Sequence, residues 1–423
     1  VDVVKALLQH GADPAITTNV LDIPARAGVD DTAGVVRDTI LSDFRAEYGV
    51  GNLNWRPTPV QVRVAVRAAQ AVQRTLGDAE EEEEIYDPQS EDFLGFTELV
   101  GTQGGLTALL HAVREGQVET AMTLLDGGAD INQVSAGDHT SPMLIATING
   151  HFDLALLLLD RGADPNIASD AGATPLFTAL NTHWAPKARY PQQQAYQQQQ
   201  ASYLDVMKAM LEAGADPDVR LRKHIWYMSY TFDLLRVNVA GATTFWRAAY
   251  AMDVEAMMML VAFGADPNIP TVKPSERRRR GDEDDLEIDP SGLLPVPVGG
   301  LGVWPIHAAT GVGFGEGYAG NSHRHVPNGY LPAVNYLVEG LGVDVNARDF
   351  NGYNAVHHAA ARGDTELIRY LVEQGADVMT VSREGETTVD MANGPVQRIQ
   401  PFPEAMALLE SLGAINNDNC VSC

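Results

Sequence analysis

The sequence predicts an all-α solenoid, a fold in which pairs of short helices stack side by side along one axis. The first observation is a Gly-Ala-Asp phrase that recurs along the chain, with steps of 34 residues from Gly128 to Gly162 and of 33 residues from Gly342 to Gly375. The second is that an apolar segment of helix length precedes each copy. A fixed period of this length indicates stacked helical units that bury their apolar faces against each other.

The recurring glycine marks the end of one helix in each unit. Glycine adopts a left-handed backbone conformation without steric cost, so it commonly follows the last turn of a helix. Residues 152–159, for example, form an apolar helix that ends before the next glycine phrase. We expect about seven units and a degenerate cap near residues 386–413. The phrase, complete or reduced, begins at Gly11, Gly128, Gly162, Gly214, Gly264, Gly342, Gly375 and Gly413.

The other helix of each unit begins with a capping residue and a proline. Thr140 and Pro142 precede an apolar run that ends near Ala146. A threonine side chain can cap a helix, and proline suits the first turn because its missing N–H has no partner there. Polar stretches such as 135–138 and 349–352 separate the units and predict tight, β-hairpin-like turns.

These features resemble the ankyrin repeat, whose units start with Thr-Pro-Leu-His-x-Ala and end with Gly-Ala-Asp-x-Asn. Residues 172–179 (Gly-Ala-Thr-Pro-Leu-Phe-Thr-Ala) and 352–360 (Gly-Tyr-Asn-Ala-Val-His-His-Ala-Ala) match the start. The resemblance covers roughly two-thirds of the chain and implies helix-turn-helix units joined by β-hairpin-like turns. It also implies structural roles for His111, His307 and His357 at the histidine position. The final asparagine is present as Asn132, Asn166, Asn268 and Asn346.

Irregular spacing between the phrases predicts long insertions. The largest is expected to be partly helical or disordered, with a helix near residues 59–76 and an acidic run at 80–84. Further surplus segments are glutamine-rich at 184–201, aromatic at 226–232 and glycine-rich at 311–329. The predicted organisation is a partial repeat at 1–16, an insertion at 17–101, repeats at 102–269, a charged flexible insertion at 270–300, repeats with a C-terminal cap at 301–415, and a cysteine-containing tail at 416–423.

Two patterned stretches, 313–325 and 390–401, resemble segments of bacterial ankyrin-repeat proteins that carry long insertions. This resemblance implies a bacterial source. The chain starts with Val1, inside an apolar helix, rather than with Met, so we expect residues upstream of it. A targeting sequence would lie in those residues. The compartment is therefore unknown, with export from a bacterium, for example to the periplasm, as one option.

The charge of the chain narrows the classes of partner. The 29 basic and 56 acidic residues give a net charge of −27. Such a charge repels the phosphate backbone of nucleic acids, so we expect no nucleic-acid partner. It favours solubility and basic partner surfaces. The sequence also has no apolar run long enough to span a membrane.

The two cysteines, Cys420 and Cys423, both lie in the last four residues. Their Cys-x-x-Cys spacing leaves three interpretations open. They form a surface disulfide or remain free thiols with a minor role. They form a redox pair or one half of a shared metal site, because two thiolates alone do not complete a tetrahedral zinc site. They are the start of a truncated haem-attachment motif, which needs a histidine directly afterwards.

His323 and His325 lie in the glycine-rich segment at 311–329. A metal held by this pair would need a further ligand, such as Glu316 or His307. The interpretation that we favour is that both histidines hydrogen-bond the loop backbone, so we predict no metal ligands and no cofactor. No nucleophile-base or phosphate-binding pattern stands out, and we expect no catalysis.

The family resemblance implies an elongated concave surface, lined by hairpin tips and by the first helix of each unit. We therefore predict a monomeric scaffold that binds a protein partner on this concave face. The alternative is an exported redox or haem-linked protein that uses Cys420 and Cys423. The aromatic insertion either forms a binding finger or folds back on the array. The expected contact residues are His139, Asp170, Arg247, Tyr353, Arg383 and Glu384 at the tips, with Trp226 and Tyr230 in the aromatic insertion.

Overall fold

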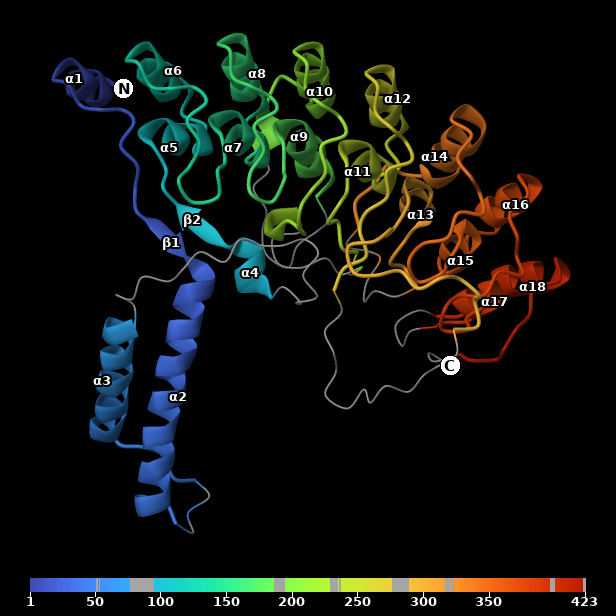
Figure 1. The fold of residues 1–423 in the computed structure, drawn as a ribbon, viewed down its shortest axis with the longest axis horizontal. Helices are drawn as coiled ribbons and strands as arrows, with labels where there is room; N and C mark the ends of the chain where they lie inside the picture. Colours follow the sequence, from blue (N-terminus) through green and yellow to red (C-terminus); the bar gives the residue numbers. More distant parts are fainter. Residues whose placement is uncertain are drawn as a thin grey trace.

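Two rows of short helices form a curved array, and a separate pair of long helices projects from it (Figure 1). The structure is a computed structural model. It describes residues 1–50, 52, 54–76, 95–185, 195–228, 235, 237–275, 289–315, 320, 323–395 and 400–420. Within these residues helices are the main regular structure of the repeats, and the strands form a single two-stranded sheet, which confirms the predicted all-α solenoid.

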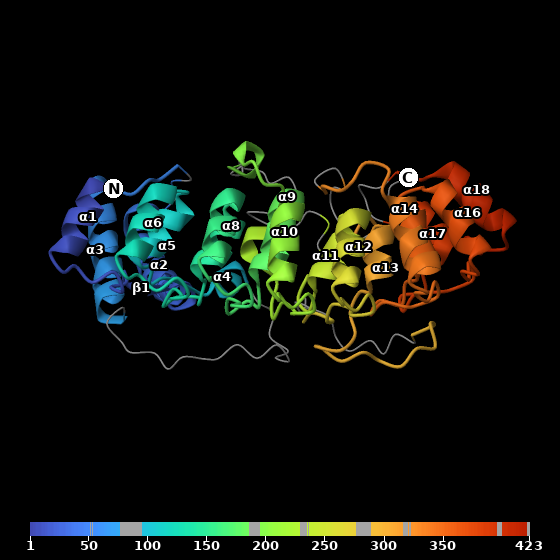
Figure 2. The ribbon, with the colours of Figure 1, turned by 90° about the horizontal axis from the view of Figure 1, so that it is seen from above.

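Seven helix pairs make up the described part of the array, and α1 stands alone at its start (Figure 1). Seen from above, the pairs follow one another in a single row (Figure 2). The inner row consists of α5 (Ala108–Arg114), α7 (Pro142–Ile148), α9 (Pro175–Trp184), α11 (Thr244–Tyr250), α13 (Pro305–Thr310), α15 (Ala355–Ala360) and α17 (Thr388–Ala392). The outer row consists of α1 (Asp2–Gln9), α6 (Val118–Asp126), α8 (Phe152–Asp160), α10 (Tyr203–Glu212), α12 (Val254–Ala262), α14 (Tyr330–Asn335) with its continuation η4 (Tyr336–Gly340), α16 (Thr365–Glu373) and α18 (Pro403–Ser411).

Hydroxyl side chains cap five of the inner helices, namely α5, α7, α9, α11 and α17. Thr107 accepts the backbone N–H of Leu110, and Thr174 accepts that of Phe177. In α7 the cap is Ser141, which accepts the N–H of Leu144, rather than the expected Thr140. Because Pro142 follows directly, Ser141 is the residue in position to accept the free N–H groups of the first turn.

The glycine of each phrase ends its outer helix in the predicted way. Gly128 and Gly162 both have a φ of +93°, in the left-handed region. A Cβ atom added at either position would meet nothing within 4 Å. The requirement for glycine is therefore set by backbone conformation and not by close packing.

Asparagine side chains tie neighbouring units together. Asn166 Oδ1 accepts the N–H of Asp216 at 2.8 Å, and its Nδ2 donates to the carbonyl of Gly214 at 3.0 Å. Asn346 repeats both bonds with Asp377 and Gly375. Asn132, Asn166 and Asn346, each the final residue of its phrase, thus bond to the turn that ends the next outer helix.

Inner helices in the C-terminal half of the array have no exposed side. Every residue of α11, α13, α15 and α17 is buried. This corrects the expectation that first helices line an open groove. In α11, residues of other segments cover the helix: the carbonyl of Trp184, at the end of α9, accepts a bond from Arg247, and His323 bonds to the carbonyl of Tyr250.

The insertion at 17–101 lies within the first hairpin and leaves the array at its tip. Strand β1 (Val20–Asp22) pairs antiparallel with β2 (Thr102–Gly104), and these strands form the hairpin stem. Between them lie α2 (Ile23–Tyr48), α3 (Pro59–Leu76) and α4 (Phe96–Val100). The helix expected near 59–76 is present as α3. We call α2 and α3 the arm, which extends away from the array (Figure 1).

Among the described residues, no helix has both the length and the apolar character needed to span a bilayer.

Candidate interaction surface

Hairpin tips form a continuous row because backbone hydrogen bonds join each tip to the next. Ala136 donates to the carbonyl of Gly105 at 3.0 Å, and Asp170 donates to that of Asp138 at 3.0 Å. The row continues through Arg222, which donates to Ala171 at 2.8 Å. Side chains at successive tips are therefore held in a fixed order on the hairpin side of the array.

His139 and Asp170 lie at adjacent tips of this row. His139 Nδ1 is 2.8 Å from Asp170 Oδ1, and the two side chains are 59% and 50% exposed. His139 also has a φ of +57°, which is uncommon for a residue with a side chain. The structure thus places both predicted residues on the surface, side by side.

Helix α4 and the turn η2 (Trp226–Met228) extend this surface. Lys223 Nζ donates to the carbonyl of Glu98 at 3.0 Å, which fixes α4 against the hairpin that carries Lys223. Phe96, at the start of α4, is exposed, and Trp226 is half-buried with its ring beside Tyr227. Sequence analysis missed Phe96, because α4 is too short for a periodic signal. Tyr230 lies outside the described residues.

Most of the predicted contact residues at the C-terminal tips bond to other residues of the same chain. Arg383 pairs with Asp289 and donates from Nη2 to the carbonyl of Leu294 at 2.7 Å. The segment carrying these two residues, 289–294, therefore lies over this tip. Tyr353 is buried and its hydroxyl donates to Glu386. Of this group, Glu384 is exposed.

Arg247 is not a surface residue, which corrects its predicted role as a tip contact. The side chain is in the middle of α11 and 0% exposed. Its Nε donates to Asn181 Oδ1 at 2.9 Å and its Nη2 to the carbonyl of Trp184 at 2.6 Å. These bonds satisfy a buried charge and join the third and fourth pairs of the array.

His323 and His325 both bond to backbone carbonyls. His323 Nε2 lies 2.8 Å from the carbonyl oxygen of Tyr250, and His325 Nδ1 lies 2.9 Å from that of Val326. Burial lowers the pKa of His323 to about 3, so this ring is neutral at ordinary pH. These contacts agree with the loop-shaping interpretation. The further ligand considered for this pair, Glu316, lies outside the described residues.

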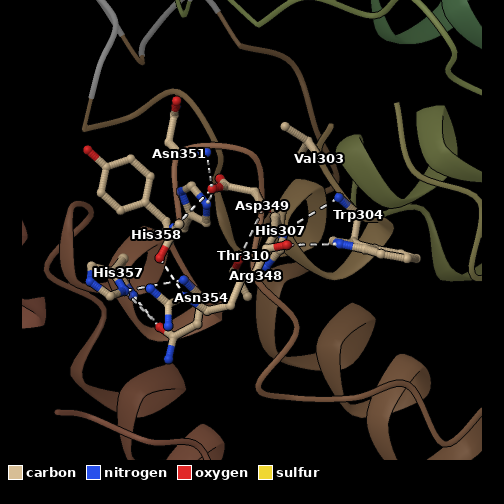
Figure 3. Close-up of polar contacts among 12 residues, drawn as sticks. Val303, Trp304, His307, Thr310, Arg348, Asp349, Asn351, Asn354, His357 and His358 are labelled. Carbon is tan, nitrogen blue, oxygen red and sulfur yellow. Dashed lines mark hydrogen bonds and ion pairs between the residues drawn. The ribbon is translucent and has the colours of Figure 1, made fainter. Parts of the chain in front are cut away.

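A buried polar cluster joins the fifth and sixth pairs (Figure 3). In the described part of the chain, His307, Asp349 and His358 are the three residues whose potential ligand atoms all lie within 4.8 Å of one another. His358 Nε2 is 3.2 Å from Asp349 Oδ2, and both side chains are 1% exposed. Burial alone would raise the pKa of Asp349, but the hydrogen bond from His358, with the other contacts of this carboxylate, outweighs it, and the pKa lies below its usual value.

The donor atoms of this cluster fit a hydrogen-bond network better than a metal site. His307 Nε2 donates to the carbonyl of Ala347 at 2.9 Å, and its Nδ1 accepts the N–H of Trp304 at 3.3 Å. Neither nitrogen has a lone pair left for a metal ion. Burial lowers the pKa of His307 to about 4, which keeps the ring neutral. The cluster therefore holds together α13, the turn that contains Ala347 and Asp349, and α15.

Histidines at the family position act as expected in two of the three cases. His307 bonds to Ala347 as described, and His357 Nε2 reaches the carbonyl of Glu386 at 3.4 Å. Each stands three residues after its N-cap, Trp304 or Asn354. His111 stands four residues after its cap, is half-buried, and does not occupy the same position.

Cys420 is disulfide-bonded. Cys423 lies outside the described residues, and the three interpretations of the Cys-x-x-Cys tail stay predictions.

Helix pairs stacked in one row, joined by hairpins and by repeated side-chain bonds, define an α-solenoid, a class of repeat protein. Its unit matches a known family model, described as ankyrin repeats (3 copies), at residues 91–169, 109–190 and 322–396. Over residues 91–190 and 322–396 the chain matches ankyrin repeats.

Curated relatives match short parts of the chain. Protein phosphatase 1 regulatory subunit 12A of Mus musculus is 35% identical over 71 residues, which are 17% of this chain and 7% of the relative. BCL-6 corepressor of Homo sapiens is 50% identical over 50 residues, 12% of this chain and 3% of the relative. The chain thus corresponds to a small part of each. Among solved structures, the human ASB11 ankyrin repeat domain is 20% identical with a TM-score of 0.43, covering 72% of this chain and 98% of that chain.

Proposed function

We propose that this chain is a non-catalytic scaffold that binds a partner protein on the concave side of its ankyrin array, through the hairpin tips. The observation that carries the proposal is the row of tips with exposed His139 and Asp170, which hydrogen bonds between successive hairpins hold in order. A surface that is preorganised in this way loses little conformational freedom when a partner binds.

Burial favours the tips over the inner helices as the contact surface. The inner helices from α11 onward are wholly buried, so they offer no side chains to a partner. The tip surface has the elements that a protein interface uses: an exposed aromatic ring at Phe96, a half-buried indole at Trp226 and the hydrogen-bonded pair of His139 and Asp170. Two relatives are named as a regulatory subunit and as a corepressor, roles that depend on contact with other proteins.

Site-specific photo-crosslinking tests the proposal. A benzophenone amino acid would replace Phe96 in one variant and Met258 in a matched control. Both side chains are exposed, at 57% and 54%, but Met258 lies on the outer helix α12. After irradiation in an extract of the source organism, we expect the Phe96 probe to give a discrete crosslinked species that mass spectrometry identifies, and the Met258 probe to give none.

A charge change separates specific from adventitious crosslinking. Asp170→Arg should reduce the yield of the crosslinked species several-fold, because it reverses one charge of the tip pair. Equal yields from the two probe positions, or a yield that Asp170→Arg does not alter, would show that the tip surface is not the binding site.

A further inference from the structure

Helix α3 has an exposed face that no part of the described chain covers. The arm touches the array at its base, and α3 packs along α2 (Figure 1). Ala65 is the buried residue of α3, with Gln61, Ala68 and Val72 half-buried near it on the side that faces α2. The opposite side of the helix lies open over its whole length.

The open face of α3 has an ordered pattern of charge and apolar residues. At 3.6 residues per turn, Arg63, Arg67 and Arg74 fall in one stripe opposite Ala65. Exposed valines flank this stripe on both sides. One side carries Val60 and Val64, which are 61% and 47% exposed, and the other carries Val62 and Val66.

The charge of α3 is opposite to that of the rest of the chain. The helix has three arginines and no acidic residue, whereas the whole chain has a net charge of −27. Residues outside α3 therefore sum to −27 − 3 = −30. None of the ion pairs found among the described residues involves α3, although α2 beside it makes two.

We propose that α3 is a docking site for an acidic amphipathic helix of a partner protein, separate from the tip surface of the array. The arginine stripe runs along the helix axis over about 16 Å at 1.5 Å per residue, a length that suits another helix lying alongside. Carboxylates on the partner would pair with the arginines, and apolar residues beside those carboxylates would cover the valines.

The arrangement of apolar residues distinguishes a protein helix from other anionic partners. A nucleic-acid backbone offers nothing apolar to cover valines on both sides of the stripe, and the remaining −30 charge would repel it. A helix that binds a membrane surface has its apolar residues together on one face and its basic residues on the other. In α3 the basic residues lie in the centre and the apolar residues at the sides.

Fluorescence anisotropy with a designed probe tests this inference on the full chain. The probe is a labelled synthetic helix as long as α3 (18 residues), with glutamates in one stripe and leucines on its two sides. A second probe carries lysine in place of each glutamate. We expect the glutamate probe to bind with an affinity that falls as ionic strength rises, and the lysine probe not to bind.

Substitutions on the arm locate the binding site. Arg67→Glu should weaken binding of the glutamate probe by about fivefold or more, and reversing all three arginines should abolish it. Arg45→Glu is the matched control, because Arg45 is exposed on α2 but outside the stripe, and it should leave the affinity unchanged. Circular dichroism of each variant checks that the arm stays helical.

Four outcomes would overturn the inference. The first is equal binding of the glutamate and lysine probes, and the second is equal effects of Arg67→Glu and Arg45→Glu. The third is α3-dependent binding of phosphatidylserine-containing vesicles or oligo-dT in place of the glutamate probe. The fourth is binding of the probe only after the glutamates at 80–84, which follow α3 in the chain, are changed to glutamine. That last result would mean that the chain itself occupies the site.

Discussion

The array and the arm are both helical, but they are stabilised differently. In α11 all seven residues are buried, whereas α2 and α3 together bury Ala33 and Ala65. The inner helices from α7 to α15 each pack between two neighbours of their row, so their stability depends on the units beside them. The arm depends on the contact between its own two helices. We therefore expect a destabilising substitution in the array to lower the stability of neighbouring units as well. A destabilising substitution in the arm should lower the stability of the arm alone.

The largest expected effect is loss of a core side chain in the array. Trp246 is fully buried, and its indole N–H donates to the carbonyl of Val303 at 2.9 Å. Trp246→Ala leaves a cavity and an unpaired carbonyl, so we expect the free energy of unfolding to fall by about 3–5 kcal/mol. Urea titration followed by circular dichroism measures it. Trp55→Ala, in the half-buried loop of the arm, is the matched control. Similar losses in the two variants would refute the contrast between the regions.

We expect an intermediate loss of stability at acidic pH, and this loss should affect the array. Burial lowers the pKa of His307 to about 4 and those of His323 and His357 to about 3. The unfolded chain binds these protons near pH 6.5, well before the folded chain does, so unfolding takes up protons and stability falls as the pH falls below that value. At about pH 5 each such histidine should cost about 2 kcal/mol.

The pH dependence can be assigned by replacing one buried histidine. His323→Gln should make the slope of unfolding free energy against pH shallower by up to one proton than in the unmodified chain. Urea midpoints at a series of pH values give both slopes. An unaltered slope in His323→Gln would mean that this ring is not neutral and buried in the folded protein.

The smallest effect on the array should come from breaking the arm. Ala65 is buried between α2 and α3, so Ala65→Glu places a charge in their contact and should unfold the arm. Hydrogen exchange should then be fast in both arm helices, while the free energy of unfolding of the array, measured by urea titration, changes by less than about 0.5 kcal/mol. Val62→Glu, at an exposed position of the same helix, should leave the arm folded. A large shift of the array midpoint would show that the two regions are coupled.

Local sequence signals were sufficient to predict the array. The glycine of each phrase has to be glycine because of its positive φ, so it marks helix ends wherever it occurs. Helix α3 was also predictable, because it starts at Pro59 and its apolar residues recur regularly. Helix α2 was missed because Gly28 and Gly34 interrupt it, and its apolar residues do not form a stripe.

The candidate surface was only partly predictable, because it depends on contacts between residues far apart in sequence. His139 and Asp170 are exposed tip residues, as the repeat geometry indicates. Arg247 is buried because Trp184, 63 residues earlier, covers it. Arg383 is held by residues of the charged insertion about ninety positions before it, through Asp289. No local pattern around Arg247 or Arg383 indicates these partners.

The pairing of β1 with β2 determines where insertions and deletions in the sequence can be accommodated. Asp22 lies opposite Thr102, so the chain leaves and re-enters the first hairpin at neighbouring positions. Two antiparallel strands need no more than a short turn to connect them. The arm can therefore be lengthened, exchanged or deleted without shifting the register of any repeat, as long as α4 keeps its bond to Lys223. A binding activity carried by the arm can then change in evolution while the tip surface is kept.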